Sequence, residues 1–289
     1  MRIPMSDRSD IFSWILGAAL AAVALTGLTG CAASGNTAEG GTSAISTPSV
    51  SESVGTDVVT ASDEPAARKR ARVRLQLAVG YFENGQTTVA LDELKQALVI
   101  DPTFSEAYNL RGLVYMRMND PRLAEDSFRR AVALNPRDAN TLHNYGWFLC
   151  QQSRYADASQ AFNQALASPN YGDRAKTFMA LGLCQQSAGQ YAEAERNLAK
   201  SYELNAGNPI TGYNLAALLY RRGDLVRSQF YIRRLNNSEL ANAESLWLGI
   251  KVERQMENRD AMAQLGDQLK KRFGQSKEAA SYARGAFDE

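Results

Sequence analysis

From about residue 71 to the C-terminus, apolar residues recur at intervals of three and four positions, in blocks separated by short polar segments. Residues at these intervals share one face of a helix, so the pattern predicts a run of amphipathic helices. The blocks come in pairs, and Gly85, Gly189 and Gly223 mark turns between the two helices of a pair. A last block, 276–286, predicts a helix that covers the open end of the array.

The pairs repeat with a period of 34 residues. Five positions of the first pair return 34 residues later: Tyr81, Ala90, Leu94, Ala97 and Pro102 become Tyr115, Ala124, Phe128, Ala131 and Pro136. Later pairs keep the small residues, with a two-residue insertion around Pro169-Asn170. This pattern resembles the tetratricopeptide repeat, a two-helix unit. The resemblance implies an all-α fold, a right-handed superhelix of about six repeats with a C-terminal capping helix.

The expected repeat region covers residues 67–289. Its parts are 71–104, 105–138, 139–174, 175–208, 209–241 and 242–275, followed by the cap 276–289. Pro102 and Pro136 end the second helices of the first two repeats, because proline disfavours helix at the preceding residue.

Residues 1–30 read as a secretion signal whose apolar run, IFSWILGAALAAVALTGLTG, decays into small residues. It ends at Leu28-Thr29-Gly30-Cys31, which resembles the bacterial lipobox, and this resemblance implies that Cys31 is lipidated and becomes the mature N-terminus. Ala32 follows, which favours sorting to the periplasmic face of the outer membrane. The alternative is an uncleaved membrane helix with a small buried cysteine.

Residues 31–66 hold the lipidated cysteine and a predicted flexible periplasmic tether. The stretch after Cys31 is rich in Ser, Thr, Gly and Ala without apolar periodicity, a composition that cannot bury a core. Its root-mean-square reach is roughly 30–35 Å.

Composition and charge argue against several function classes. The 289 residues include 32 basic and 31 acidic side chains, a net charge of +1, which gives no basis for nucleic-acid binding. One histidine and three cysteines without CxxC spacing argue against a metal site and against a catalytic triad. No phosphate loop, GxSxG or HExxH motif occurs. We therefore expect no enzyme, no cofactor and no small-molecule substrate.

The tetratricopeptide resemblance also implies a protein-binding groove lined by the first helix of each repeat. The positions that contact ligands in the family carry Leu75, Val79, Phe82, Asn109, Leu113, Met116, His143, Trp147, Gln151, Met179, Leu183, Tyr213 and Tyr220. This set is mainly apolar, so an amphipathic helix or an apolar strand of a partner protein fits it better than a charged peptide tail. The alternative is that several of these residues pack between repeats.

Cys150 and Cys184 fall on the first helices of neighbouring repeats. Their positions within the repeat differ, so we expect the side chains to point apart, although an oxidising periplasm leaves a disulfide open. His143 is open to two interpretations, a proton switch or an ordinary polar residue of the groove, and the second is favoured because no partner group is visible.

The lipobox, the tether and the repeats together resemble the PilF/PilW family of type IV pilus lipoproteins. The strongest local matches are LNPRDANTLHN at 134–144 and NYGWFLCQQSRYADASQAFNQAL at 144–166. The resemblance covers roughly 67–289 and implies a protein that promotes localisation or multimerisation of the pilus secretin PilQ, or stability of the pili. The alternatives are a general envelope scaffold for outer-membrane protein assembly or cell-wall enzymes, and an enzyme with an unrecognised site.

Overall fold

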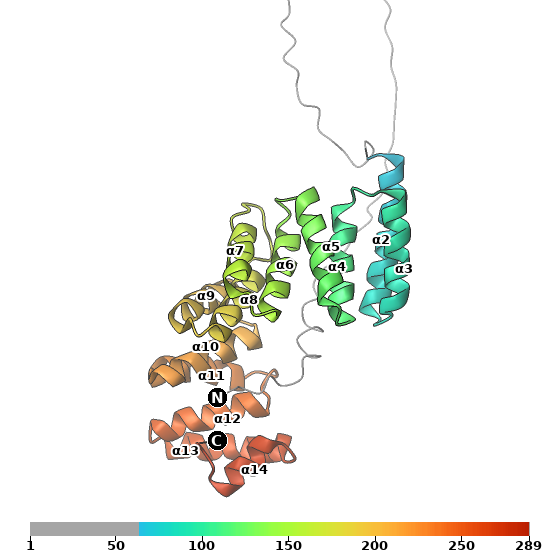
Figure 1. Ribbon diagram of the computed structural model, residues 1–289. Helices are drawn as coiled ribbons and strands as arrows, with labels where there is room; N and C mark the ends of the chain where they lie inside the picture. Colours follow the sequence, from blue (N-terminus) through green and yellow to red (C-terminus); the bar gives the residue numbers. More distant parts are fainter. Residues whose placement is uncertain (1–63, 289) are drawn as a thin grey trace, which may run out of the picture. The chain divides into compact units, whose positions relative to one another are not determined.

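The computed structural model describes residues 64–288, and its helices form one unit that starts at Ala66 (Figure 1). This described part contains thirteen helices and no strand. None of these helices has both the length and the apolar composition needed to cross a membrane. The predicted signal 1–30, the lipobox cysteine Cys31 and nearly all of the tether 31–66 lie outside the described residues.

Twelve of the helices form six antiparallel pairs, as the 34-residue period predicted. The first helices of the pairs are α2 (Ala66–Glu83), α4 (Ser105–Arg117), α6 (Ala139–Gln151), α8 (Arg174–Ser187), α10 (Pro209–Arg222) and α12 (Ala243–Gln255). The second helices are α3 (Thr87–Ile100), α5 (Pro121–Leu134), α7 (Tyr155–Leu166), α9 (Tyr191–Leu204), α11 (Leu225–Asn236) and α13 (Arg259–Phe273). A last helix, α14 (Lys277–Arg284), packs on α12 and α13 as the predicted cap.

In four of the six pairs, a glycine of the first helix faces a large residue 16 positions later. A Cβ placed on Gly112 would lie 2.7 Å from the Phe128 ring, and one on Gly146 would lie 3.0 Å from the Phe162 ring. The same spacing joins Gly182 to Leu198 and Gly249 to Leu265 within their pairs, and it also joins Gly266 of α13 to Tyr282 of the cap α14. Both phenylalanines are fully buried. The periodic small residues therefore mark the points where paired helices cross closely.

The first helix of every pair is followed by one residue in the left-handed conformation. These residues are 34 or 36 positions apart, have φ between 58° and 83°, and are Gly85, Asn119, Ser153, Gly189, Gly223 and Glu257. This geometry ends a helix and turns the chain, and glycine adopts it without steric cost. The sequence pattern predicted this turn only at the three glycines, and the other three repeats make the same turn with larger residues.

The second helices end where the prolines predicted. Helix α3 ends at Ile100 before Asp101-Pro102, and α5 ends at Leu134 before Asn135-Pro136. Side-chain caps stabilise the starts of α5, α6 and α10 to α14: the Asp120 carboxylate before α5, for example, accepts a hydrogen bond of 3.0 Å from the Leu123 N–H.

First helices of neighbouring repeats also touch one another: α2 contacts α4, α4 contacts α6, α6 contacts α8, and α10 contacts α12. Among residues 64–288, no two second helices are in comparable contact. The first helices therefore lie on the inside of the superhelical curve and the second helices on the outside. We call the inner side, formed by α2, α4, α6, α8 and α10, the first-helix surface.

Candidate protein-binding surface

Most of the predicted binding residues lie on the first-helix surface with part of each side chain accessible. Gln151 is exposed. The partly buried members are Leu75, Val79, Asn109, Leu113, Met116, Trp147, Leu183, Tyr213 and Tyr220. A residue of this kind packs between repeats with one side and faces solvent with the other, so it can serve both stability and binding.

The middle of the surface is apolar. Leu113, Met116 and Trp147 all pack against one buried cluster, whose members include Phe128 and Phe148. Leu183 packs in the same way on the next cluster along the chain. The core thus fixes the positions of these side chains, and an apolar surface that is held in place in the unbound protein loses little entropy when a partner docks.

Polar side chains interrupt the apolar surface at defined places. The Asn144 amide donates a 3.1 Å hydrogen bond to the Asn109 side-chain oxygen, which links α6 to α4. Farther along, the Gln255 amide donates a 2.9 Å hydrogen bond to the Tyr220 hydroxyl. Burial raises the pKa of Tyr213 to about 12. These tyrosines therefore stay neutral at physiological pH and present hydroxyl groups rather than charges.

Three of the predicted contact residues are buried and offer no surface to a partner. Phe82 is fully buried, and the Arg117 guanidinium covers its ring at 5.0 Å and donates to its carbonyl at 2.7 Å. Met179 is 8 % exposed and packs into the cluster that contains Leu215 and Leu219 of the next repeat. For these residues the alternative interpretation holds, because each side chain fills the contact between two repeats.

His143 is the third buried residue, and it has a partner group. Its Nδ1 lies 2.8 Å from the Thr177 hydroxyl, which in turn lies 2.7 Å from the Tyr171 hydroxyl. All three side chains are buried. Burial, aided by the charge of Lys176, lowers the pKa of His143 to about 3. His143 is therefore a neutral structural residue that ties α6 to α8 and to the insertion between repeats three and four.

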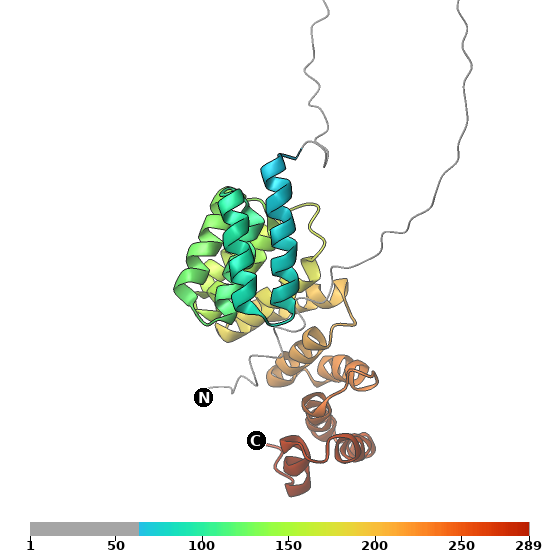
Figure 2. The same ribbon diagram turned by 90° about the vertical axis from the view of Figure 1, so that its right-hand side faces the viewer.

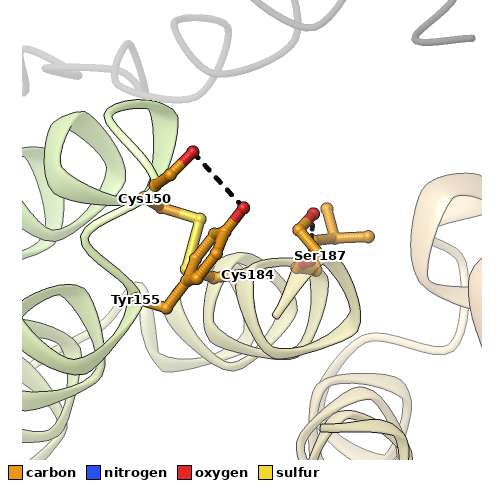
Figure 3. Close-up of a disulfide and its surroundings, with 6 residues drawn as sticks. Cys150, Tyr155, Cys184 and Ser187 are labelled. Carbon is orange, nitrogen blue, oxygen red and sulfur yellow. Dashed lines mark hydrogen bonds between the residues drawn. A yellow bond between two sulfur atoms is a disulfide. The ribbon is translucent and has the colours of Figure 1, made fainter. Parts of the chain in front are cut away.

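Cys150 of α6 and Cys184 of α8 form a disulfide, with their Cα atoms 5.7 Å apart (Figure 3). The expectation that these side chains point apart was wrong. Cys150 follows Gly146 by four residues and Cys184 follows Gly182 by two, so the two cysteines are offset by about 200° around the helix axis. Side chains at equivalent positions of neighbouring repeats point in the same direction and do not meet. An offset of about half a turn instead points the two cysteine side chains toward each other.

The disulfide lies at the first-helix surface. Trp147 and Cys150 pack against the same buried cluster, and that cluster includes Cys184. Figure 3 shows Tyr155 beside the sulfur atoms, and its hydroxyl lies 3.4 Å from the Ser153 hydroxyl. The bond therefore fixes the distance between α6 and α8, the two helices that carry the centre of the surface. The two-residue insertion between repeats three and four was the signal that could have revealed this pairing, because it offsets Cys184 from Cys150 by two positions within the repeat.

The paired helices, the buried small-to-large crossings and the apolar inner side define a tetratricopeptide repeat protein. Two repeat family models match the chain, a TPR repeat over residues 80–119 and a tetratricopeptide repeat over residues 109–175. At the level of fold alone, the chain is similar to the TPR protein YrrB, with a TM-score of 0.55 over 66 % of this chain and 97 % of that one, at 16 % identity.

Comparison with curated and solved proteins places the chain in one family of tetratricopeptide repeat proteins. The type IV pilus assembly protein PilF of Pseudomonas aeruginosa is 35 % identical over 199 residues, which cover 69 % of this chain and 79 % of PilF. The solved structure of P. aeruginosa PilF superposes with a TM-score of 0.68 at 34 % identity, over 75 % of this chain and 99 % of that one. That of PilW, described as a widely conserved type IV pilus biogenesis factor, also gives 0.68, at 28 % identity over 74 % and 99 %. The chain belongs to the PilF family.

Proposed function

We propose that this protein is an outer-membrane lipoprotein of type IV pilus biogenesis, and that its first-helix surface holds a segment of the pilus secretin PilQ. The observation that carries the proposal is the 35 % identity to a type IV pilus assembly protein across most of both chains. The similarity to PilW supports the same assignment. Holding a secretin segment would promote localisation or multimerisation of the secretin, the role of a pilotin, or stabilise the pili.

The proposed membrane attachment rests on the sequence before the repeats. Removal of residues 1–30 would leave Cys31 as the acylated N-terminus, and 31–66 would tether the repeats to the membrane. Each buried methylene of the acyl chains contributes about 0.8 kcal/mol, so several chains give stable anchoring. The tether raises the effective concentration of the repeats toward a client in the same membrane.

The proposed client segment is an amphipathic helix or an apolar strand. The accessible sides of Leu113, Met116 and Trp147 offer apolar contacts, and the amides of Asn109 and Gln151 offer hydrogen bonds at their edge. A segment with apolar residues on one face would bury that face on α4 and α6, in the manner of helix-in-groove or strand recognition.

The anchor is tested by Cys31→Ala, followed by fractionation of the secretin. We expect PilQ multimers in the outer membrane to fall sharply, while the variant repeats remain folded in the periplasm. Normal multimers in the outer membrane with unlipidated protein would show that piloting through the anchor is wrong. Capture of cell-wall enzymes without secretin would favour the alternative of a general envelope scaffold.

The surface is tested by Met116→Lys together with Trp147→Glu. We expect these changes to reduce capture of PilQ, because a charge on the apolar inner side must be desolvated when the client docks. The matched control is Val99→Glu, an apolar-to-charged change at a side chain on α3 that is 81 % exposed. Thermal melting of each variant accompanies the capture assay. Equal loss of capture in the double variant and in the Val99→Glu control would contradict the assignment. So would a double variant that loses its fold without a selective loss of capture.

A further inference from the structure

The chain that follows the capping helix folds back onto α12. Helix α14 ends at Arg284, and Gly285, with φ of 69°, turns the chain. The Ala286 N–H then donates a hydrogen bond to the Ser281 carbonyl, and the next residue, Phe287, lies against the first helix of the last repeat. Figures 1 and 2 show α14, in dark red, at the end of the array opposite α2.

The Phe287 ring contacts an indole, a guanidinium and a phenol ring. It stacks on Trp247, with the ring centroids 5.5 Å apart and the planes 18° from parallel. The Arg254 guanidinium lies over the Phe287 ring, 4.4 Å from its centroid. The Tyr282 ring meets it edge-on at 6.2 Å. Aromatic stacking and cation–π contacts both need a ring at this place, so these three residues select an aromatic side chain over an aliphatic one.

An acidic residue follows the ring and lies near two cations of α12. The Asp288 carboxylate is 3.8 Å from the Arg254 guanidinium. Burial lowers the pKa of Lys251, and the charge of Asp288 opposes this shift. Glu253 does not neutralise the two cations, because it accepts two hydrogen bonds from the Arg233 guanidinium of α11. This part of α12 therefore favours a carboxylate directly after the aromatic residue.

The same part of α12 continues the first-helix surface. Arg254 has the place in its repeat that the predicted contact residue Gln151 has in repeat three, five residues after the glycine of the helix crossing. Burial raises the pKa of Tyr220, another predicted contact residue, and the charges of Arg254 and Asp288 also act on its hydroxyl. Helices α10 and α12 are in direct contact. We call the residues of α12 that surround Phe287 and Asp288 the α12 inner face: Trp247, Lys251 and Arg254.

Phe287 and Asp288 are held less firmly than the capping helix. Helix α14 covers the open end of the array, and its Tyr282 fills the space beside Gly266. No described residue forms a hydrogen bond with the main chain of Phe287 or Asp288. The Asp288 side chain is fully exposed, and Phe287 is only partly buried. Local opening of such a segment costs far less free energy than unfolding of the array, and it uncovers Trp247, which is 8 % exposed with the ring in place.

We propose that the α12 inner face is a docking site for a segment of a partner protein in which an aromatic residue precedes an acidic one. Phe287 and Asp288 occupy this face in the unbound chain, and the partner segment displaces them. The bound pair supplies the argument for this chemistry, since its ring stacks on Trp247 and its carboxylate meets Arg254. The inference rests on the proposed function only in taking the first-helix surface as the side that partners contact.

A second copy of the chain is a weaker occupant of this face than the chain's own pair. A segment joined to its site through a short connection has an effective concentration on the order of millimolar. Phe287 and Asp288 of a second copy have the same affinity without this advantage, so they do not displace the intrachain pair from a dilute protein. A partner segment must bind more tightly than the pair, or be held near the face by a contact elsewhere on the first-helix surface.

The test measures, by fluorescence anisotropy, binding of a labelled peptide with the sequence of residues 283–289, ARGAFDE, to the chain from residue 32 onward. We expect weak binding to the unchanged chain. Phe287→Ala should tighten it roughly tenfold, because the intrachain pair no longer competes. Asp288→Lys alters only an exposed side chain and should tighten it about two- to fivefold, the contribution of an exposed ion pair. Arg254→Glu, added to Phe287→Ala, should abolish binding, and a peptide with serine in place of phenylalanine should not bind.

The matched control is Phe230→Ala, which removes a ring that is 59 % exposed on α11 and should leave peptide binding as in the unchanged chain. Circular dichroism checks that each variant keeps its helices, and Asp288→Lys decides the outcome if Phe287→Ala unfolds the cap. Equal binding to the unchanged chain and to both opened variants, no binding to any of them, or binding that survives Arg254→Glu would overturn the proposal. So would a dimer in sedimentation that Phe287→Ala dissociates. The assay contains no secretin, so its failure and a failure of PilQ capture are separate results.

Discussion

The ring of Phe128 occupies the space that a side chain at Gly112 would need. A Cβ on Gly112 would stand 2.7 Å from two atoms of this ring, closer than any relaxed contact between carbon atoms. Phe128 is fully buried, and its ring also contacts the rings of Tyr145 and Phe148, so it cannot move aside. The crossing of α4 and α5 therefore depends on the absence of a side chain at Gly112.

We predict that Gly112→Ala lowers the free energy of unfolding by about 1–3 kcal/mol, the usual cost of placing an extra carbon in a packed core. Urea unfolding followed by circular dichroism measures the change. The matched control is Gly80→Ala in α2, where a Cβ meets no atom within 4 Å. Alanine should stabilise that helix by roughly 0.5–1 kcal/mol. Equal effects at the two glycines would show that helix propensity, and not the crossing, governs Gly112.

The periodic residues made the fold predictable from the sequence. Gly112 and Gly146 on the first helices, with Phe128 and Phe162 on the second, repeat at fixed spacing because each pair solves the same packing problem. Pro102 ended α3 for a local reason, since proline acts on the residue before it. The repeated spacing and the helix-ending prolines are both patterns along the chain, so they can be recognised in a single sequence.

The candidate surface was less predictable because exposure depends on neighbours in space. Phe82 and Met179 occupy positions that face the inner side in the family, yet Arg117 covers the first and the following repeat covers the second. The pairing of Cys150 with Cys184 needed the rotation of one helix relative to the next. The spacing of each cysteine from the glycine of its own helix gives the size of that rotation, but whether it turns the two side chains toward each other depends on how the helices pack in space.

We predict that loss of the Cys150–Cys184 disulfide lowers the free energy of unfolding by roughly 3–4 kcal/mol, because the bond closes a loop of 34 residues. Urea unfolding of a Cys31→Ala chain, with and without reductant, measures this loss. The control replaces Cys150 and Cys184 by alanine as well, and reductant should then have no effect. A chain whose unfolding midpoint ignores reductant from the outset would contradict the prediction.

The left-handed turn after α12 gives a stabilising prediction. Glu257 has φ of 58°, a conformation that costs residues with a Cβ about 1–2 kcal/mol. Glu257→Gly should therefore raise the free energy of unfolding by about 0.5–1 kcal/mol after the greater flexibility of glycine in the unfolded chain is subtracted. Gly223→Ala, at the equivalent turn with φ of 83°, should do the reverse. Both positions are exposed, so changes of the same sign would show that contacts other than the turn decide the outcome.

Acid should weaken the contact between repeats three and four through His143. Its pKa is about 3 in the folded protein and near 6.5 in the unfolded chain, so the unfolded chain binds more protons between these values. Stability is therefore complete above pH 6.5 and falls as the pH decreases, by about 1.4 kcal/mol per pH unit. Between pH 6.5 and 5 carboxylates scarcely titrate, and His143 is the one histidine of the chain. Urea unfolding should show a loss of about 2 kcal/mol across this window, and His143→Gln should remove the slope. A slope that persists in the glutamine variant would assign the acid sensitivity to other groups.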